Sequence, residues 1–342
     1  MAIDLKKLKP TTVSRDLKGK FVFLYGPAKI GKTTLAVQFP RNLLLAVEHG
    51  YNVIDNIYAV DVPTWAEFKK YVKQLQDDEL KNMFDTITID TITLLYERCE
   101  AYICDREGVD KLADIPFGAG FNMLDSEFET WVRKITQIMD NEGKIAYGLC
   151  LIGHEKSRTE SDGQISVTHI MPDMSNRCAK IINRMVDITA YIGMEEDGNR
   201  YIYPRQFVKE DKTQRIEIFA GSHFYGLNDK IELSYDGLVN AIADAMTVDG
   251  TGKEITLSET PVQVMQKEEL NFNEIRDSIK KIVKKLKDLD ENGDSNHMGA
   301  YKRIVDEQLG KGKLVKDCTE TQVDQLSLIL DDLEEYVESN NL

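Results

Sequence analysis

The sequence predicts an α/β protein: a core built on a mostly parallel sheet with an appended β-hairpin, followed by a small all-α domain. Two observations lead to this prediction. Between residues 18 and 246, short apolar or β-branched runs alternate with longer stretches of helical periodicity, whereas after residue 271 only helical patterns remain. Alternating strands and helices form a parallel sheet that helices cover on both faces.

The length of 342 residues allows one large domain and a smaller one. Changes in pattern divide the chain into an N-terminal extension (1–17), the α/β core (18–246), a linker without clear periodicity (247–271) and a helical accessory domain (272–342).

The individual elements follow from periodicity and from the residues that stop it. Core strands are expected at residues 21–25, 43–47, 85–90, 144–153 and 187–194. Core helices are expected at residues 31–39, 64–80, 91–105 and 123–139. Two runs joined by a charged turn, 201–208 and 215–220, predict the antiparallel hairpin. In the accessory domain, helices are expected at residues 272–289, 300–309 and 321–337.

Composition narrows the class of protein. A hydrophobic fraction of 42% and a charged fraction of 30% are typical of a globular protein. No apolar run approaches the roughly 18–20 residues that cross a bilayer, so no membrane partner is expected. The five cysteines are scattered and form no C-x-x-C pair, which favours a reduced, cytoplasmic location and no zinc site.

The net charge of −15 argues against DNA binding through the overall field of the protein. Residues 247–342 alone hold 13 Lys and Arg against 21 Asp and Glu, a net of −8. Any nucleic-acid binding must therefore come from local basic loops.

A phosphate-binding motif of the form G-x-x-x-x-G-K-[ST] lies between the first expected strand and the first expected helix, which is the context in which it functions. It comprises Gly26, Pro27, Ala28, Lys29, Ile30, Gly31, Lys32 and Thr33, and Thr34 follows it. Backbone N–H groups of such a loop surround the phosphates of a nucleoside triphosphate. We expect Lys32 to reach the β- and γ-phosphates and Thr33 to hold Mg²⁺. The alternative is a Gly-rich turn without this role.

Two carboxylates are expected at neighbouring strand ends. Asp90 ends the third strand and is expected to order Mg²⁺; its alternative is to cap the next helix. Glu48 follows the second strand and is expected to orient the water that attacks the γ-phosphate; its alternative is a solvated turn residue. His154 ends the fourth strand, where it can hydrogen-bond the γ-phosphate or simply cap the strand.

In their order and chemistry these motifs resemble the core of RecA-type recombinases over about residues 18–246. The strand at residues 44–49 ends in Glu-His (LLAVEH), Asp90 is followed by a small hydroxyl residue, and His154 takes the place of the polar sensor that opens a DNA-binding loop. The chain looks more specifically like phage-encoded nucleotide-binding proteins that are core-only relatives of RecA, through the triplet HEK that starts at His154 and the segment FYGLND at residues 224–229. Some of these proteins are ATP-dependent single-strand annealing proteins.

The resemblance implies a RecA-like ATPase that uses ATP and Mg²⁺ and acts on single-stranded DNA in phage recombination, annealing or replication, in the cytoplasm of the bacterial host. It also implies sites between subunits of a ring or filament. One feature departs from the family: residues 221–223 (GSH) stand where Lys and Arg often face a neighbour's γ-phosphate. Substitutes for those cations on the expected hairpin are Arg205, Lys209, Lys212 and Arg215.

Two segments correspond to the DNA-binding loops of that family. Residues 108–122 carry Phe117 and Phe121 among glycines, and residues 155–175 open with Lys156 and Arg158. Basic and aromatic side chains on mobile loops can bind a single strand by charge and stacking. Ordinary surface connections, or a Phe117 packed in the core, are the alternatives. The densest basic cluster, Lys280, Lys281, Lys284, Lys285 and Lys287, is either a further DNA contact or a solvated helix face.

A second class of function also fits the sequence. The acidic composition favours an ATP-gated scaffold or loader whose partner is a phage replication or recombination protein. A small-molecule kinase leaves Glu48 and the hairpin without a role, and no N-K-x-D motif indicates a GTPase.

Overall fold

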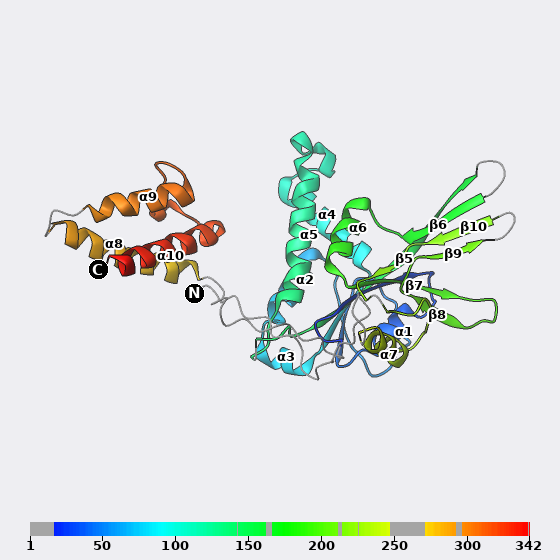
Figure 1. Ribbon diagram of the computed structural model, residues 1–342. Helices are drawn as coiled ribbons and strands as arrows, with labels where there is room; N and C mark the ends of the chain where they lie inside the picture. Colours follow the sequence, from blue (N-terminus) through cyan, green and yellow to red (C-terminus); the bar gives the residue numbers. More distant parts are fainter. Residues whose placement is uncertain are drawn as a thin grey trace. The chain divides into compact units, whose positions relative to one another are not determined.

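The computed structural model describes residues 17–141, 143–161, 166–210, 214–224, 226–246, 271–291, 296–340 and 342. The chain divides into two compact units (Figure 1), whose described parts are residues 17–246 and 271–342. The predicted extension and linker lie almost entirely outside the described residues, so their boundaries stay predictions.

The first unit is built on a twisted, mostly parallel sheet with the strand order β12-β8-β7-β1-β5-β4-β2-β3. Its strands are β1 (Phe21–Gly26), β2 (Asn42–Ala46), β3 (Tyr58–Asp61), β4 (Thr86–Asp90), β5 (Gly148–Ser161), β7 (Ile188–Met194), β8 (Arg200–Tyr203) and β12 (Ile231–Glu232). The strands from β7 to β3 in this order are parallel, while β8, β12 and the short β11 (Gly221–Ser222) add antiparallel pairs. This confirms the predicted α/β class.

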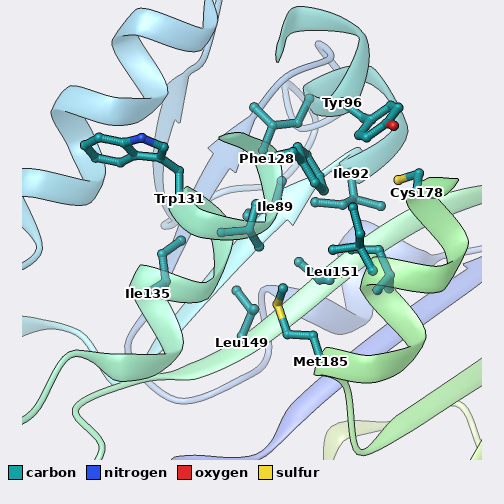
Figure 2. Packing of buried hydrophobic residues seen from close by; sticks show 14 of the residues in the cluster. Ile89, Ile92, Tyr96, Phe128, Trp131, Ile135, Leu149, Leu151, Cys178 and Met185 are labelled. Atoms are coloured by element: carbon teal, nitrogen blue, oxygen red, sulfur yellow. The ribbon is translucent and has the colours of Figure 1, made fainter. Parts of the chain in front are cut away.

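Helices cover both faces of this sheet, as Figure 1 shows. On one face pack α2 (Trp65–Gln74), α4 (Ile92–Glu107), α5 (Ala119–Gln137) and α6 (Asn176–Met185); on the other pack α1 (Lys32–Ala36) and α7 (Tyr235–Ala245). Side chains of a strand alternate between faces, so Phe23 joins the first core and Leu24 the second. In the first core, Phe128 and Ile135 of α5 lie over Ile89 of β4 (Figure 2). Shorter helical elements complete the unit: α3 (Asp78–Met83), η2 (Leu112–Asp114) and η3 (Pro116–Gly118).

Strand β5 leaves the core sheet after His154 and continues into a second group of strands. It pairs antiparallel with β6 (Ser166–Pro172), β6 pairs parallel with β10 (Gln214–Ile218), and β10 pairs antiparallel with β9 (Phe207–Glu210). We call residues 155–161 of β5 together with β6, β9 and β10 the arm; Figure 1 shows it projecting beyond the core sheet.

The arm corrects two expectations. The described residues between 155 and 175 are mostly strand rather than a loop, because β6 is rich in β-branched residues (Val167, Thr168 and Ile170), which favour strands. The predicted antiparallel hairpin is present as β9 and β10, but its first strand covers only residues 207–210, because residues 200–203 pair with β7 instead. An alternating pattern gives the strand but not its partner.

Most other predicted elements are present with shifted ends. The single helix expected at 64–80 is two helices, because Asp77 accepts a hydrogen bond from the Glu79 amide and begins a new helix. The fourth strand starts at residue 148 rather than 144. Strand β3 and helices α6 and α7 were not predicted from the sequence.

The second unit is a bundle of α8 (Phe272–Glu291), α9 (His297–Leu309) and α10 (Val323–Ser339), with the short turns η4 (Val315–Asp317) and η5 (Glu320–Gln322). Ile279, Leu286, Leu326 and Ile329 lie in its core. The three predicted helices are present, and Thr319 and Gln322 form a capping box before α10. None of the described helices combines the length and hydropathy that crossing a bilayer requires.

Candidate functional site: a phosphate-binding loop with converging carboxylates

The loop between β1 and α1 has the backbone that a phosphate-binding motif needs. Gly26 approaches the neighbouring strand so closely that a Cβ would lie 2.3 Å from the Ile192 carbonyl oxygen, so only glycine fits. Gly31 precedes α1 with φ at 109°, which side chains disfavour. Lys29 is also left-handed, with φ at 64°. The predicted motif therefore forms a curled loop between strand and helix.

Lys32 is held inside this loop. Its side chain is only 5% exposed, and Nζ donates hydrogen bonds to the carbonyl oxygens of Gly26 (2.9 Å) and Pro27 (2.7 Å). Burial lowers the pKa of the Lys32 ammonium, and the nearby carboxylates of Asp90 and Glu48 oppose that shift. The loop thus presents a buried cation where the predicted triphosphate would lie.

Asp90 lies against the loop from the end of β4. Thr33 Oγ1 donates a 2.6 Å hydrogen bond to Asp90 Oδ2. Burial raises the pKa of Asp90, while this hydrogen bond and the Lys32 charge act in the opposite direction. Asp90 Oδ1 is buried and has no hydrogen-bond partner among the described residues. Asp90 therefore faces the loop, and its orphaned oxygen needs a ligand.

These oxygens fit Mg²⁺. The ion prefers hard oxygen donors and is usually bound by one or two protein groups together with phosphates and water. Thr33 Oγ1 and Asp90 Oδ1 supply such donors side by side. Within the described ranges no cluster of three His, Cys, Asp or Glu side chains could hold a metal without such help.

Glu48 and His154 meet above the strand ends. Nε2 of His154 lies 3.3 Å from Oε1 of Glu48, and both side chains are about a third exposed. The amides of Val47 and Glu48 donate to the Asp90 carbonyl oxygen, which fixes this turn beside β4. The strand order β1-β5-β4-β2 puts the phosphate loop, His154, Asp90 and Glu48 along one edge of the sheet. Because the Glu48 side chain is partly exposed, solvent water can reach the space between its carboxylate and the loop.

One carboxylate near the loop escaped the sequence analysis. Glu155 lies on the opposite sheet face from His154, next to Tyr191, and its Oε2 is buried without a described hydrogen-bond partner. Its charge also acts on Lys32. The alternation of β5 past His154 is the signal that would have identified its direction.

A cleft of about 650 Å³ lies between the start of α1 and the start of β8, next to the loop. Among its lining residues are Gly31, Thr34, Gln38, Arg200 and Tyr201. A Cβ added to Gly31 would lie 3.3 Å from Arg200 Nη1, so the guanidinium reaches the loop itself. The Arg200 guanidinium forms no hydrogen bond or ion pair with the residues that the structure describes, although its backbone pairs with Met194 of β7. The sequence analysis did not select Arg200, because only the fold of β8 brings it to the loop.

Comparison with known proteins agrees with this geometry. The sequence profile described as "AAA domain" matches residues 18–215, which is more than half of the chain. The chain belongs to the AAA domain family. It is also 27% identical over 348 residues to the SPbeta prophage-derived uncharacterized protein YorG of Bacillus subtilis (strain 168), covering 98% of this chain and 99% of that protein. The match to the AAA domain spans every loop and carboxylate described above.

Outside the nucleotide loop of this AAA domain, the predicted DNA contacts are dispersed. Phe117 is fully exposed in η3 with φ at 59°, so the alternative of a core position is wrong. Phe121 lies in the first turn of α5, with the Arg177 guanidinium 5.4 Å from its ring centre. Lys156 and Arg158 lie on β5 in the arm, near Asp173 and Glu160 respectively.

Three of the predicted substitutes for a trans-acting cation are already paired within the first unit. Arg205 lies 3.5 Å from Asp229, Lys209 lies 3.5 Å from Glu196, and Arg215 contacts both Glu210 and Glu217. Lys212 lies outside the described residues. A trans role for any of them stays a prediction.

Proposed function

We propose that this AAA-domain protein hydrolyses ATP with Mg²⁺ and uses the turnover to control binding of single-stranded DNA in phage recombination, annealing or replication. The observation that carries the ATPase proposal is the convergence of Asp90 on Thr33 beside the buried Lys32, with Glu48 at the adjoining strand end. The host cytoplasm is the proposed compartment.

The proposed roles follow from position. Lys32 exchanges its carbonyl partners for phosphate oxygens, whose negative charge compensates for the hydration that burial removes from the ammonium. Thr33 and Asp90 hold Mg²⁺, which supplies charge neutralisation on the phosphates. Glu48 orients a water and accepts its proton, and His154 holds the Glu48 carboxylate in place or contacts the γ-phosphate.

The cleft beside the loop is the proposed place for the nucleoside. Its volume of about 650 Å³ accommodates a base and sugar, Tyr201 offers an aromatic ring, and Arg200 and Gln38 offer hydrogen-bond donors. The choice of ATP over GTP rests on the resemblance to RecA-type ATPases.

Single-stranded DNA is the proposed ligand for three reasons. The motif order resembles RecA-type cores, and the β5 strand that carries His154 runs on into the arm with Lys156 and Arg158. An exposed Phe117 offers a ring for base stacking. By the same resemblance we propose self-association into a ring or filament.

A protein partner is the second candidate, and the charges favour it. The arm's described strands hold four cations (Lys156, Arg158, Lys209, Arg215) and four carboxylates (Glu155, Glu160, Glu210, Glu217), so the arm has no net positive charge. Around Phe117, residues 105–125 hold five acids against two basic residues. An ATP-gated scaffold or loader for a phage replication or recombination protein would use such surfaces.

Oligonucleotide binding separates the two candidates. A labelled single strand is titrated with protein alone, with ATP and Mg²⁺, and with ADP, across salt concentrations. Nucleotide-dependent affinity with a steep salt slope supports DNA as the ligand. Nucleotide turnover without any oligonucleotide binding rejects DNA and leaves the protein partner.

A further inference from the structure

The most concentrated free positive charge in the described chain lies on α8 of the second unit. Lys281, Lys284 and Lys285 are exposed, and none of them forms a hydrogen bond or an ion pair with a described residue. Their neighbours differ: Lys280 pairs with Asp277 at 2.8 Å, and Lys287 pairs with Glu291 at 3.6 Å.

This cluster costs the helix stability. Lys281 and Lys285 are four residues apart, as are Lys280 and Lys284, and like charges at this spacing repel. The last turn of α8 contains no basic residue, so the lysines lie too far from the helix end to gain from its dipole. Asp277, four residues before Lys281, and Asp288, four residues after Lys284, offset part of this repulsion, but Lys285 adds further positive charge to the same exposed stretch.

The second unit separates its charges along the chain. Residues 272–316 hold 11 Lys and Arg against 8 Asp and Glu, whereas residues 317–342 hold 8 Asp and Glu and no Lys or Arg. The excess of acidic residues in the accessory domain therefore comes from residues 317–342, most of them on α10, whereas the segment that contains α8 has an excess of basic residues.

We propose that Lys281, Lys284 and Lys285 of α8 form a contact for the phosphates of single-stranded DNA. The inference rests on the proposed function and adds a binding surface to it. An anionic membrane suits this helix less well, because membrane-surface helices bury their apolar face in lipid. Here Ile275, Ile279 and Leu286 are already buried in the bundle.

The test replaces the three lysines together: Lys281→Gln, Lys284→Gln and Lys285→Gln. The matched control replaces three exposed lysines of the same unit: Lys311→Gln, Lys313→Gln and Lys316→Gln. Both full-length variants lose the same charge, and neither touches the nucleotide loop. Binding of a labelled oligonucleotide in ATP and Mg²⁺ is measured across salt, with basal ATP turnover and thermal unfolding alongside.

We expect the α8 variant to bind at least about tenfold more weakly near 0.1 M salt and its salt slope to fall by about 2, since each single-strand phosphate contact contributes roughly 0.7. Its melting temperature and basal turnover should not fall, because the substitutions remove repulsion. The control should bind like the parent. Equal losses in both variants, or no loss in the α8 variant, overturn the inference while leaving the proposed function intact. A parent protein that binds no oligonucleotide overturns both. Binding to phosphatidylserine vesicles is measured on the same variants by co-sedimentation, and a loss confined to vesicle binding overturns the inference and assigns the surface to membranes.

Discussion

His154 Nε2 lies 3.3 Å from the carboxylate of Glu48, although the two residues are 106 positions apart in the chain. They come from β5 and from the turn after β2, on either side of β4, which carries Asp90. The side chains at the ends of three adjoining strands therefore form one polar group next to the phosphate loop.

Lys32→Ala and Glu48→Gln should separate binding from turnover. Without the Lys32 ammonium the loop loses its main phosphate partner, so nucleotide binding should be lost. Glu48→Gln keeps the shape but cannot accept a proton, so binding should persist while turnover falls about 10²–10⁴-fold. Nucleotide affinity and phosphate release are measured separately, with Glu79→Gln on exposed α3 as control. Normal hydrolysis by Glu48→Gln would remove the assignment of Glu48.

His154→Ala should uncouple nucleotide state from DNA affinity. It removes the group that links Glu48 to the strand leading into the arm, so ATP and ADP complexes should bind oligonucleotide equally well. Nucleotide affinity itself should change little. The control is His223→Ala, which alters an exposed histidine next to Asp187. An unchanged difference between the ATP and ADP complexes would contradict the sensor role.

Asp90→Asn should stabilise the nucleotide-free protein at neutral pH while abolishing turnover. Because burial raises the pKa of Asp90, the folded state binds its proton more tightly than the unfolded state does. Protonated Asp90 therefore contributes its full stabilisation of the folded state below the unfolded pKa of 3.8, and this stabilisation is lost as the pH rises through the folded pKa. Thermal unfolding should show the variant a few degrees more stable at pH 7–8, at about 2–4 °C per kcal/mol, with a smaller gain near pH 4. If the variant melts at a lower temperature than the parent at pH 7–8, the claim that the buried Asp90 carboxylate destabilises the nucleotide-free protein is wrong.

Arg200→Ala should weaken nucleotide binding without altering the fold. The guanidinium is free among the described residues and reaches Gly31, so a nucleotide in the cleft gains a charged hydrogen bond. Loss of one such bond corresponds to roughly a 10–100-fold weaker affinity. Arg205→Ala, which removes an arginine paired with Asp229, is the control in a fluorescent-nucleotide titration. Equal affinities of the two variants would place the nucleotide elsewhere.

Tyr25→Phe should loosen the arm from the phosphate loop. The Tyr25 hydroxyl, one residue before the loop, donates to the Phe219 carbonyl oxygen just after β10. Its loss should cost about 1 kcal/mol and reduce the effect of ATP on oligonucleotide binding. Tyr147→Phe is a matched control, since its hydroxyl donates to the Leu75 carbonyl oxygen at 2.8 Å, far from the loop in sequence. It should lower stability similarly and leave the ATP effect unchanged. The same reduction of the ATP effect in both variants would argue against a special link through Tyr25.

The sequence predicted the nucleotide loop well because its signal is local. The spacing of Gly26, Gly31, Lys32 and Thr33 constrains backbone shape within eight residues, and the strand before it and helix after it have clear patterns. Asp90 and Glu48 were also predictable, because parallel strands end at one edge of the sheet. The hydrogen bond from Thr33 to Asp90 confirms that Asp90 faces the loop.

Strand partners and the residues brought in by folding were not predictable in this way. Residues 201–208 read as one strand, but the chain turns between Tyr203 and Phe207 and places the two pieces in different pairings. Arg200 and Glu155 gain their positions from those pairings, which no local pattern specifies. The same holds for α6, whose ten residues are short enough to pass for a loop.

Because β5 is one continuous strand of 14 residues, the sheet beneath the nucleotide and the arm share a backbone. A ligand that shifts the arm would act on the same strand that carries His154 beside the nucleotide loop, and any coupling between the two sites would be reciprocal. Whatever factor ATP applies to the arm's ligand, that ligand applies to ATP. Measuring ATP affinity with and without the arm's ligand would therefore also report how ATP changes the affinity for that ligand.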